Sequence, residues 1–186
     1  MERRLDNFYI EKLLKGETDC FASIVEKYSK QVFSLIVRIV GNREDAEELT
    51  QDTFMKVFKS LRSFHGDSAF STWLYRIAYN IAVSATRKQK REVSYIEEGT
   101  LPEIADEESE GSWEEDLQNA RLEYLQQALK MLSGDDRALI MMFYKDNLPM
   151  NEIASVTGMS EVNVKTRIFR IRKKLLTKIK TMEDNI

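Results

Sequence analysis

The sequence has few of the residues that stabilise small secreted or metal-binding proteins. Its 186 residues include one cysteine, Cys20, and one histidine, His65. A lone cysteine excludes an internal disulfide framework and fits a reducing compartment, and this pair gives no zinc-ligand spacing. No apolar run approaches the ~20 residues of a membrane span, and residues 1–6 lack the apolar core of a signal peptide. We therefore expect a cytoplasmic protein without membrane insertion, metal or cofactor.

Proline and glycine are also scarce, with two and seven residues respectively. Apolar residues instead repeat at steps of three and four over long stretches, which is typical of helices that bury one face. The pattern predicts an all-α protein, and the length is enough for two small helical domains. The predicted helices cover residues 6–15, 18–40, 42–61, 69–87, 113–132 and 138–144, followed by two more near the C-terminus.

Charge is unevenly distributed along the chain. The total is −3, but residues 1–91 carry +4, residues 92–136 carry −12 and residues 137–186 carry +5. The helical spacing stops and resumes within the acidic part, so we expect an acidic flexible linker over residues 92–112 between domains spanning residues 1–91 and 113–186. As a tethered polyanion, this linker either competes with nucleic acid for the basic domains or merely keeps itself solvated. The composition leaves both options open.

Residues 149–174 have the pattern of two helices around one tight turn. Pro149 suits the first turn of a helix, where its missing N–H costs little. Gly158 suits the left-handed end of that helix, and Ser160 suits the N-cap of the next. The small Ala154 allows two helices to approach closely, with Val164 packing back on the first. This spacing predicts a helix-turn-helix.

The second helix of this motif carries cations around an apolar seam. In such motifs the N-terminal end meets base edges of duplex DNA, while the flanking cations meet phosphates. The alternative is a solvated basic helix of an αα-hairpin, but turn, cap and one-sided charge together favour DNA binding. The candidate residues are Ser160, Glu161, Asn163, Lys165, Thr166, Arg167, Arg170 and Lys173.

The predicted helix over residues 69–87 interleaves aromatic and cationic residues, as single-stranded nucleic acid requires for stacking and phosphate contact. The alternative is that the aromatics belong to the core, which we prefer for Phe70 and Trp73. For the other aromatics and their polar neighbours the spacing leaves both interpretations open. The candidates here are Phe64, Tyr75, Arg76, Tyr79, Asn80, Arg87, Lys88 and Arg91.

Two sets of motifs together resemble a known family. Residues 45–54 (DAEELTQDTF) and 64–80 (FHGDSAFSTWLYRIAYN) are similar to conserved region 2 of the extracytoplasmic-function (ECF) bacterial sigma factors. Residues 132–172, with EIA at 152–154 and VKTRIFRIR at 164–172, are similar to region 4. The resemblance covers nearly the whole chain in order, and it implies a sigma subunit of RNA polymerase that is not an enzyme. The alternative is an autonomous helix-turn-helix regulator with an N-terminal sensor domain, which would not bind core polymerase.

The resemblance also implies roles for surfaces that spacing alone would leave as solvated. It implies that the region 2 domain melts the −10 promoter element and captures a flipped base, with Phe64, Arg76 and Asn80 as carried-over residues. It further implies that the C-terminal domain docks on the β flap of polymerase and reads the −35 duplex. An anti-sigma factor is a further implied partner, and we expect a monomer in the free state. The residues implied for the β′ clamp helices are Asp45, Glu48, Gln51 and Asp52.

Overall fold

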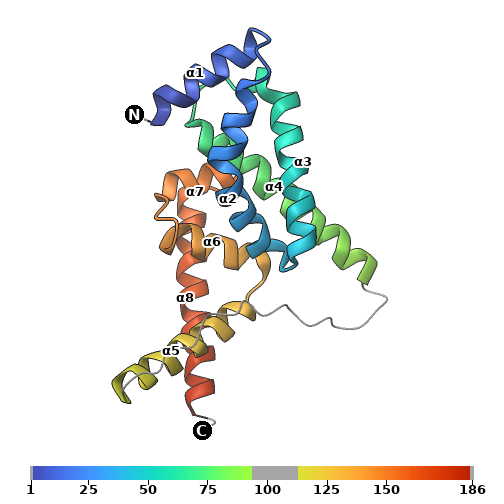
Figure 1. Ribbon diagram of the computed structural model, residues 1–186. Coiled ribbons are helices and arrows are strands. Elements are labelled where there is room, and N and C mark those ends of the chain that lie inside the picture. Colours follow the sequence, from blue (N-terminus) through green and yellow to red (C-terminus); the bar gives the residue numbers. More distant parts are fainter. Residues whose placement is uncertain (1, 94–112, 185–186) are drawn as a thin grey trace.

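The computed structural model describes residues 2–93 and 113–184 of the chain. These residues form helices joined by short turns, and no strand occurs among them (Figure 1). The predicted all-α fold is confirmed. Within these ranges, no helix is both long and apolar enough to cross a membrane. The predicted linker over residues 92–112 lies almost entirely outside the described residues, and so does the side chain of Arg91.

The N-terminal domain is a helical bundle built around its second helix, which packs against the other three (Figure 1). Its apolar residues are buried in the order that the spacing predicts, and each large one contributes about 1.5–3 kcal/mol of burial. The buried face of this helix consists of Ile24, Tyr28, Val32, Leu35, Ile36 and Ile39. The elements are α1 (Glu2–Leu14), α2 (Cys20–Val40), α3 (Arg43–Ser60), the 3-10 turn η1 (Leu61–Ser63) and α4 (Phe70–Val93).

The turn between α2 and α3 fixes how the two helices pair. Gly41 takes a left-handed conformation with φ of 77°, which ends α2 and is accessible to glycine without strain. Asn42 then caps α3, because its side-chain oxygen accepts a hydrogen bond of 3.1 Å from the backbone N–H of Asp45. The predicted start of this helix is therefore confirmed, and α3 runs back alongside α2 (Figure 1).

The C-terminal domain contains the predicted helix-turn-helix. Gly158 has φ of 73° and ends the first helix of the motif, and Ser160 Oγ accepts the N–H of Asn163 at 3.3 Å at the start of the second. Ala154 and Val164 are buried where the two helices meet. The elements of this domain are α5 (Trp113–Lys130), α6 (Gly134–Tyr144), α7 (Met150–Thr157) and α8 (Glu161–Glu183).

Several helix boundaries differ from the predicted ones. The first helix begins at Glu2, four residues before the predicted start at residue 6. The fourth helix continues to Val93, beyond the predicted end at residue 87, because a run of charged residues has no apolar period by which the sequence could extend the helix. The sixth helix begins at Gly134, four residues before the predicted start at residue 138, because Ser133 Oγ caps it by accepting the Asp136 N–H at 3.3 Å.

A half-buried arginine joins α5 to α6. Arg137 donates hydrogen bonds of 3.0–3.1 Å to the carbonyl oxygens of Leu129, Lys130 and Leu132. These carbonyls lie at the end of α5, where a helix leaves its last acceptors unpaired. Partial burial lowers the pKa of Arg137, and the three carbonyl acceptors satisfy the donors of the desolvated guanidinium.

The two domains pack directly against each other. The contacts run between α4 and α7 and between α2 and α6, so one apolar core extends through both domains. Figure 1 shows α6 and α7 seated against α2 and α4, while α5 and the end of α8 extend away from the N-terminal bundle. We call this contact the interdomain seam and the arrangement that contains it the closed form.

Candidate nucleic-acid and polymerase interfaces

Helix α8 presents one buried and one open face. Its apolar seam of Val164, Ile168, Ile171 and Leu175 is buried against the rest of the C-terminal domain. Most of the residues predicted to bind duplex DNA lie on the open face, and they combine polar groups in the first turn with cations further along. Those that the structure leaves exposed are Ser160, Glu161, Asn163, Lys165, Thr166, Arg170 and Lys173.

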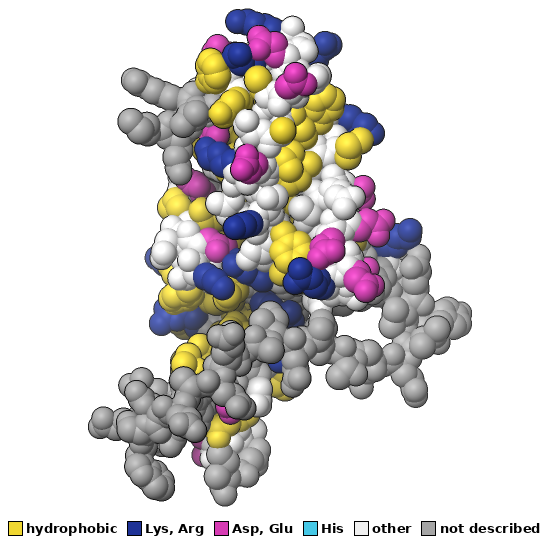
Figure 2. Space-filling model, viewed as in Figure 1, with side chains coloured by type: hydrophobic (Ala, Val, Ile, Leu, Met, Phe, Trp, Pro, Cys, Tyr) yellow, Lys and Arg dark blue, Asp and Glu magenta, His cyan; other side chains and the backbone are white. Residues whose placement is uncertain are grey.

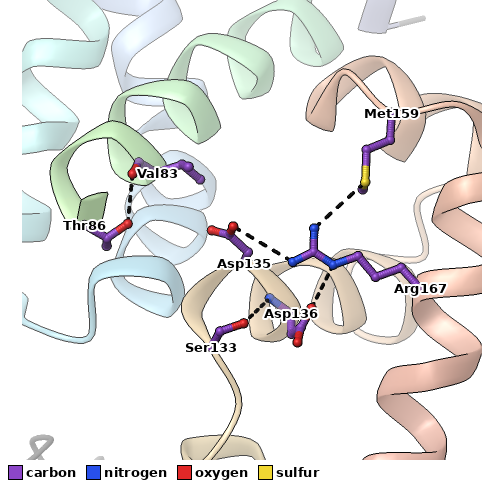
Figure 3. A network of polar contacts seen from close by, with 7 residues as sticks. All are labelled: Val83, Thr86, Ser133, Asp135, Asp136, Met159 and Arg167. Carbon is purple, nitrogen blue, oxygen red and sulfur yellow. Dashed lines mark hydrogen bonds and ion pairs between the residues drawn. The ribbon is translucent and has the colours of Figure 1, made fainter. Parts of the chain in front are cut away.

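Arg167 differs from the other predicted residues of this helix. Its Nε donates to Asp136 Oδ1 at 2.8 Å and its Nη2 lies 3.9 Å from Asp135 Oδ2, both at the start of α6 (Figure 3). Its Nη1 contacts Met159 Sδ at 3.9 Å. The side chain is 34% exposed. In this position Arg167 joins α8 to α6 through an ion pair within the domain, so its guanidinium is occupied by the carboxylates of α6.

Two exposed apolar residues in the first half of α8 escaped the sequence analysis. Phe169 is 66% and Val162 is 73% exposed. Both fall outside the three- and four-residue steps of the buried seam, so the same spacing that predicted the core could have identified them as surface residues. An exposed phenylalanine on a recognition helix suits contact with the methyl group of thymine in the major groove.

The predicted single-strand-binding residues of α4 divide between two faces. Arg76, Asn80, Arg87 and Lys88 are exposed. Tyr75 and Tyr79, on the neighbouring face, turn toward the C-terminal domain, where Tyr75 lines a cavity of about 510 Å³ together with residues of α2 and α6. The structure therefore exposes the cations and Asn80 to solvent and leaves the two tyrosines less accessible.

Phe64 lies just before α4 in an aromatic cluster. Its ring centroid is 5.5 Å from that of Phe70 and 5.4 Å from that of Trp73, at edge and tilted geometries that aromatic pairs prefer. Phe70 is buried and Trp73 half-buried, as preferred from the sequence, whereas Phe64 remains half-exposed at the edge of the cluster. The cluster holds Phe64 in place while leaving part of its ring accessible to a base.

Tyr79 is only 6% exposed. Burial raises the pKa of its phenol, and the carboxylate of Asp135 raises the pKa further, whereas Arg167 and Arg87 lower it. Asp135 and Arg167 belong to the C-terminal domain, so the surroundings of Tyr79 come from both sides of the interdomain seam. In the closed form this ring is not available to stack on a base.

The outer face of α3 combines acidic and apolar side chains. Glu48, Gln51 and Asp52 are exposed, while Asp45 is half-buried at the capped start of the helix. Met55 and Phe58, at 55% and 43% exposed, continue the same face, because residues three and four apart are neighbours on a helix. Figure 2 shows acidic side chains gathered near the start of α3 and apolar ones beyond them.

The outer face of α3 is also separate from the interdomain seam, since α3 packs against α2, α4 and η1. Among the described residues, no group of three or more histidine, cysteine, aspartate or glutamate side chains is placed to hold a metal ion. The candidate surfaces of the described chain are thus docking surfaces, one acidic and apolar on α3, and two cationic on α4 and α8.

Comparison with known proteins agrees with this division. The Sigma-70 region 2 family model matches residues 24–92, and the Sigma-70, region 4 model matches residues 122–175. The chain is 31% identical over 189 residues to the ECF RNA polymerase sigma factor SigW of Bacillus subtilis (strain 168), covering 93% of this chain and 96% of that one. It is 32% identical over 192 residues to the ECF RNA polymerase sigma-E factor of Escherichia coli (strain K12), with 97% of each chain covered.

A solved structure is similar as well. The sigma factor RpoE from Bartonella quintana, in complex with the anti-sigma factor NepR, superposes with a TM-score of 0.66 at 26% identity, covering 88% of this chain and 98% of that chain. The two family models account for both helical domains, and the relatives match over nearly their full length. The chain belongs to the ECF family of RNA polymerase sigma factors, which are non-enzymatic transcription initiation factors.

Proposed function

We propose that this sigma factor binds core RNA polymerase through the outer face of α3, reads the −35 duplex with α8 and opens the −10 element with α4. The observation that carries the proposal is the presence of two exposed cationic helix faces, one in each domain, beside a separate acidic and apolar face. Phosphate contacts by cations position such a protein on DNA, and base contacts give it specificity.

On α8 the proposed roles follow position along the helix. Ser160, Glu161 and Asn163 lie in the first turn, where base edges are reached in this motif. The contact with base edges continues along the helix at Lys165, Thr166 and Phe169. The ring of Phe169 suits contact with the methyl group of thymine. Arg170 and Lys173 contact phosphate or a base edge farther along. Arg167 acts mainly by holding α8 on α6 through Asp136, and contributes to DNA binding through that placement.

On α4 the exposed residues provide the first contacts with the −10 strand. Arg76, Arg87 and Lys88 supply charge along the helix, and Asn80 supplies an amide that can read the edge of an unpaired base. Phe64 offers the accessible part of a fixed aromatic ring for stacking. Tyr75 and Tyr79 join this surface only when the C-terminal domain moves away.

On α3 we propose that Asp45, Glu48, Gln51 and Asp52 meet the β′ clamp helices of polymerase. Met55 and Phe58 supply the apolar part of this contact, since exposed apolar residues beside charged ones are typical of docking sites. The C-terminal domain docks on the β flap. Because this function requires polymerase and chromosomal DNA, the protein works in the cytoplasm.

We further propose that an anti-sigma factor regulates this chain, supported by the similarity to RpoE, whose structure was determined with the anti-sigma factor NepR. The free chain is proposed to be monomeric. The alternative of a ligand-sensing regulator has lost its main support, because the Sigma-70 region 2 match accounts for the N-terminal domain.

The test is run-off transcription with purified core polymerase and a library of promoter sequences. Transcripts that require this protein and start at a shared −35 and −10 pattern would support the proposal. As a control, a chain with Asn80→Ala should still associate with core enzyme but start fewer transcripts, because Asn80 is exposed and is not among the residues proposed to meet polymerase. Tight, sequence-specific DNA binding by the free chain together with no association with core polymerase would contradict the proposal.

A further inference from the structure

We infer that Arg167 is a restrained cation, and that its carboxylate partners on α6 determine how well α8 discriminates promoter DNA from other DNA. Asp135 and Asp136 keep the guanidinium away from the phosphates and hold α8 in one orientation. Asp136 is therefore a positioning residue that raises specificity without touching DNA. The inference rests on the proposed function of α8 and gives a role to residues outside that helix.

The restraint acts on all three nitrogens of the Arg167 guanidinium. Nε donates to Asp136 Oδ1 at 2.8 Å, and Nη2 lies 3.9 Å from Asp135 Oδ2 (Figure 3). Nη1 donates to Met159 Sδ at 3.9 Å. Met159 belongs to the turn between α7 and α8, so the guanidinium is held between the start of α6 and the turn of the helix-turn-helix.

Arg167 lies at the border of the open face of α8. Residues three and four apart are neighbours on a helix, so Arg167 adjoins Asn163 and Arg170, which are both exposed. A guanidinium at this position could reach a phosphate of the same duplex if its carboxylate partners were absent. The restraint thus removes one cation from the face that is proposed to meet DNA.

Phosphate competes poorly with these partners for the guanidinium. The side chains of Asp136 and Asp135 are 20% and 29% exposed, and salt screens partly buried pairs less than exposed ones. Hydrogen bonds between charged groups are also roughly twice as strong as neutral ones. Because two carboxylates face one guanidinium, drawing Arg167 away would leave two unpaired negative charges beside the DNA.

The specificity of α8 depends on this restraint because phosphate and base contacts respond to it differently. A free cation strengthens binding to every sequence, since neutralising phosphates releases counterions whatever the bases are. A fixed orientation of α8 strengthens only those complexes in which the base edges match the side chains. Restraining Arg167 therefore lowers affinity for unrelated DNA and preserves affinity for the −35 element.

The experiment measures binding of the full-length chain to two duplexes between about 50 and 200 mM salt. One duplex carries the −35 sequence shared by the transcripts, and the other carries the same bases in scrambled order. We expect Asp136→Ala to tighten binding of the scrambled duplex about threefold or more at the lowest salt. Its log–log salt slope should steepen by about 0.9, the contribution of one additional phosphate contact.

Affinity of Asp136→Ala for the −35 duplex should change less than about twofold, because the new phosphate contact offsets the lost orientation of α8. The ratio of specific to non-specific affinity should therefore fall about threefold. Asp136→Glu keeps the carboxylate and should retain most of the discrimination. An unchanged ratio in a folded Asp136→Ala chain would overturn the inference.

Arg167→Ala tests whether the effect passes through the guanidinium. This variant should leave the salt slope on the scrambled duplex unchanged, and adding Asp136→Ala to it should change that affinity less than about 1.5-fold. A slope that becomes shallower by about one charge would mean that Arg167 already contacts phosphate. A full gain in the double variant would mean that Asp136 acts by its own repulsion of DNA. Either result would overturn the inference.

The matched control for charge is Glu183→Ala. Glu183 is exposed in the last turn of α8, ~24 Å along the helix from Arg167 at ~1.5 Å per residue, which is more than twice the screening length of ~10 Å. It should bind both duplexes as the wild type does. An equal gain with this variant would assign the effect to net charge and overturn the inference.

Two further variants complete the design. If Asp136→Ala fails to fold, Asp135→Ala replaces it, because the 3.9 Å contact of Asp135 is the weaker of the two, and it should produce the same changes at a smaller size. Arg170→Ala tests the proposed function separately. Loss of −35 affinity in Arg170→Ala without coupling between Asp136 and Arg167 would contradict only the restraint, whereas unchanged binding of both duplexes would contradict the assignment of α8.

Discussion

Helices α8 and α4 are both proposed to contact promoter DNA, but their proposed DNA-binding residues differ in solvent exposure. The open face of α8 is almost wholly exposed, whereas α4 shows Arg76 and Asn80 to solvent and keeps Tyr79 within the interdomain seam. On the proposed roles, the duplex-binding face of α8 is accessible in this structure, whereas Tyr79 of the proposed single-strand surface on α4 is buried.

The largest expected effect would come from removing the proposed polymerase contact on α3. The double substitution Glu48→Lys and Asp52→Lys should abolish co-purification with core enzyme and all sigma-dependent open complex, while free-chain binding to −35 duplex persists. The reason is reversal of two exposed charges on the proposed docking face. Circular dichroism should remain that of the wild type, because neither side chain is buried.

The matched control for this variant is Glu11→Lys with Glu26→Lys, which makes the same change in net charge on exposed positions of α1 and α2. It should bind core enzyme normally. Normal core binding by the α3 variant would show that the acidic face of α3 is only a solvated surface and does not bind polymerase.

The next prediction addresses the exposed side of α4. Asn80→Ala should leave core binding and closed-complex formation intact and reduce permanganate reactivity of promoter thymines, because a specific side-chain contact with a base is worth about 1–3 kcal/mol. Exposure of Asn80 argues against an effect on folding. A large drop in the thermal unfolding temperature of this variant would show that Asn80 stabilises the bundle.

Two arginines on α8 allow a direct comparison within one helix. Arg170→Ala should weaken −35 binding by about 1–3 kcal/mol if Arg170 reaches a base edge, and should lower the salt dependence by about one charge if it contacts phosphate. Its unfolding temperature should not change, because the side chain is exposed.

Arg167→Ala should instead lower the unfolding temperature as well as −35 affinity, because it leaves Asp135 and Asp136 without their partner at the start of α6. Loss of a partly buried hydrogen-bonded pair costs about 1–3 kcal/mol. Equal unfolding temperatures for the two variants would mean that the Arg167 ion pair contributes nothing measurable to the fold.

The smallest expected effect is a pH dependence of the closed form. The pKa of Tyr79 is raised by burial and by Asp135, with Asp136 adding to this from α6 and with Arg167 of α8 and Arg87 of α4 opposing it. A folded-state pKa above the unfolded value means that stability is fully present below about pH 10 and is lost as the pH rises through the folded value. The closed form should therefore weaken above about pH 10.

The control is Tyr79→Phe, which has no proton to lose. Small-angle scattering between pH 8 and 11 should show a smaller expansion for this variant than for the wild type. Other tyrosines and lysines titrate in both proteins, so the difference between them is the measured quantity. Identical expansion would assign the alkaline change to groups outside the interdomain seam.

The spacing of apolar residues predicted much of the fold, because helices in small domains bury one face. The stripe of α2, the Asn42 cap and the turn at Gly158 are local features, and local chemistry specifies them. The same spacing left Tyr75 and Tyr79 undecided, since a periodic stripe indicates burial without indicating which domain provides the partner. Family resemblance supplied the proposed roles of Asp52 and Asn80, which their exposed positions allow but do not demonstrate.

The interdomain seam was the part that sequence did not predict. Its contacts join residues far apart in the sequence, such as Arg38 and Asp146, which are 108 positions apart, and nothing local marks either one. The linker hypothesis, which also foresaw a compact free chain, concerns residues outside the described ranges and stays a prediction.

The mixed face of α3 has a kinetic consequence. In the proposed contact with polymerase, the acidic residues of α3 raise the association rate by long-range attraction, and salt screens that attraction. Met55 and Phe58 act only after contact, where they lower the dissociation rate at any salt concentration. Raising salt should therefore reduce the association rate far more than it shortens the lifetime of the complex. Once assembled, a holoenzyme made with this chain would persist through conditions under which it could no longer form, so the moment of assembly decides which sigma factor a polymerase carries.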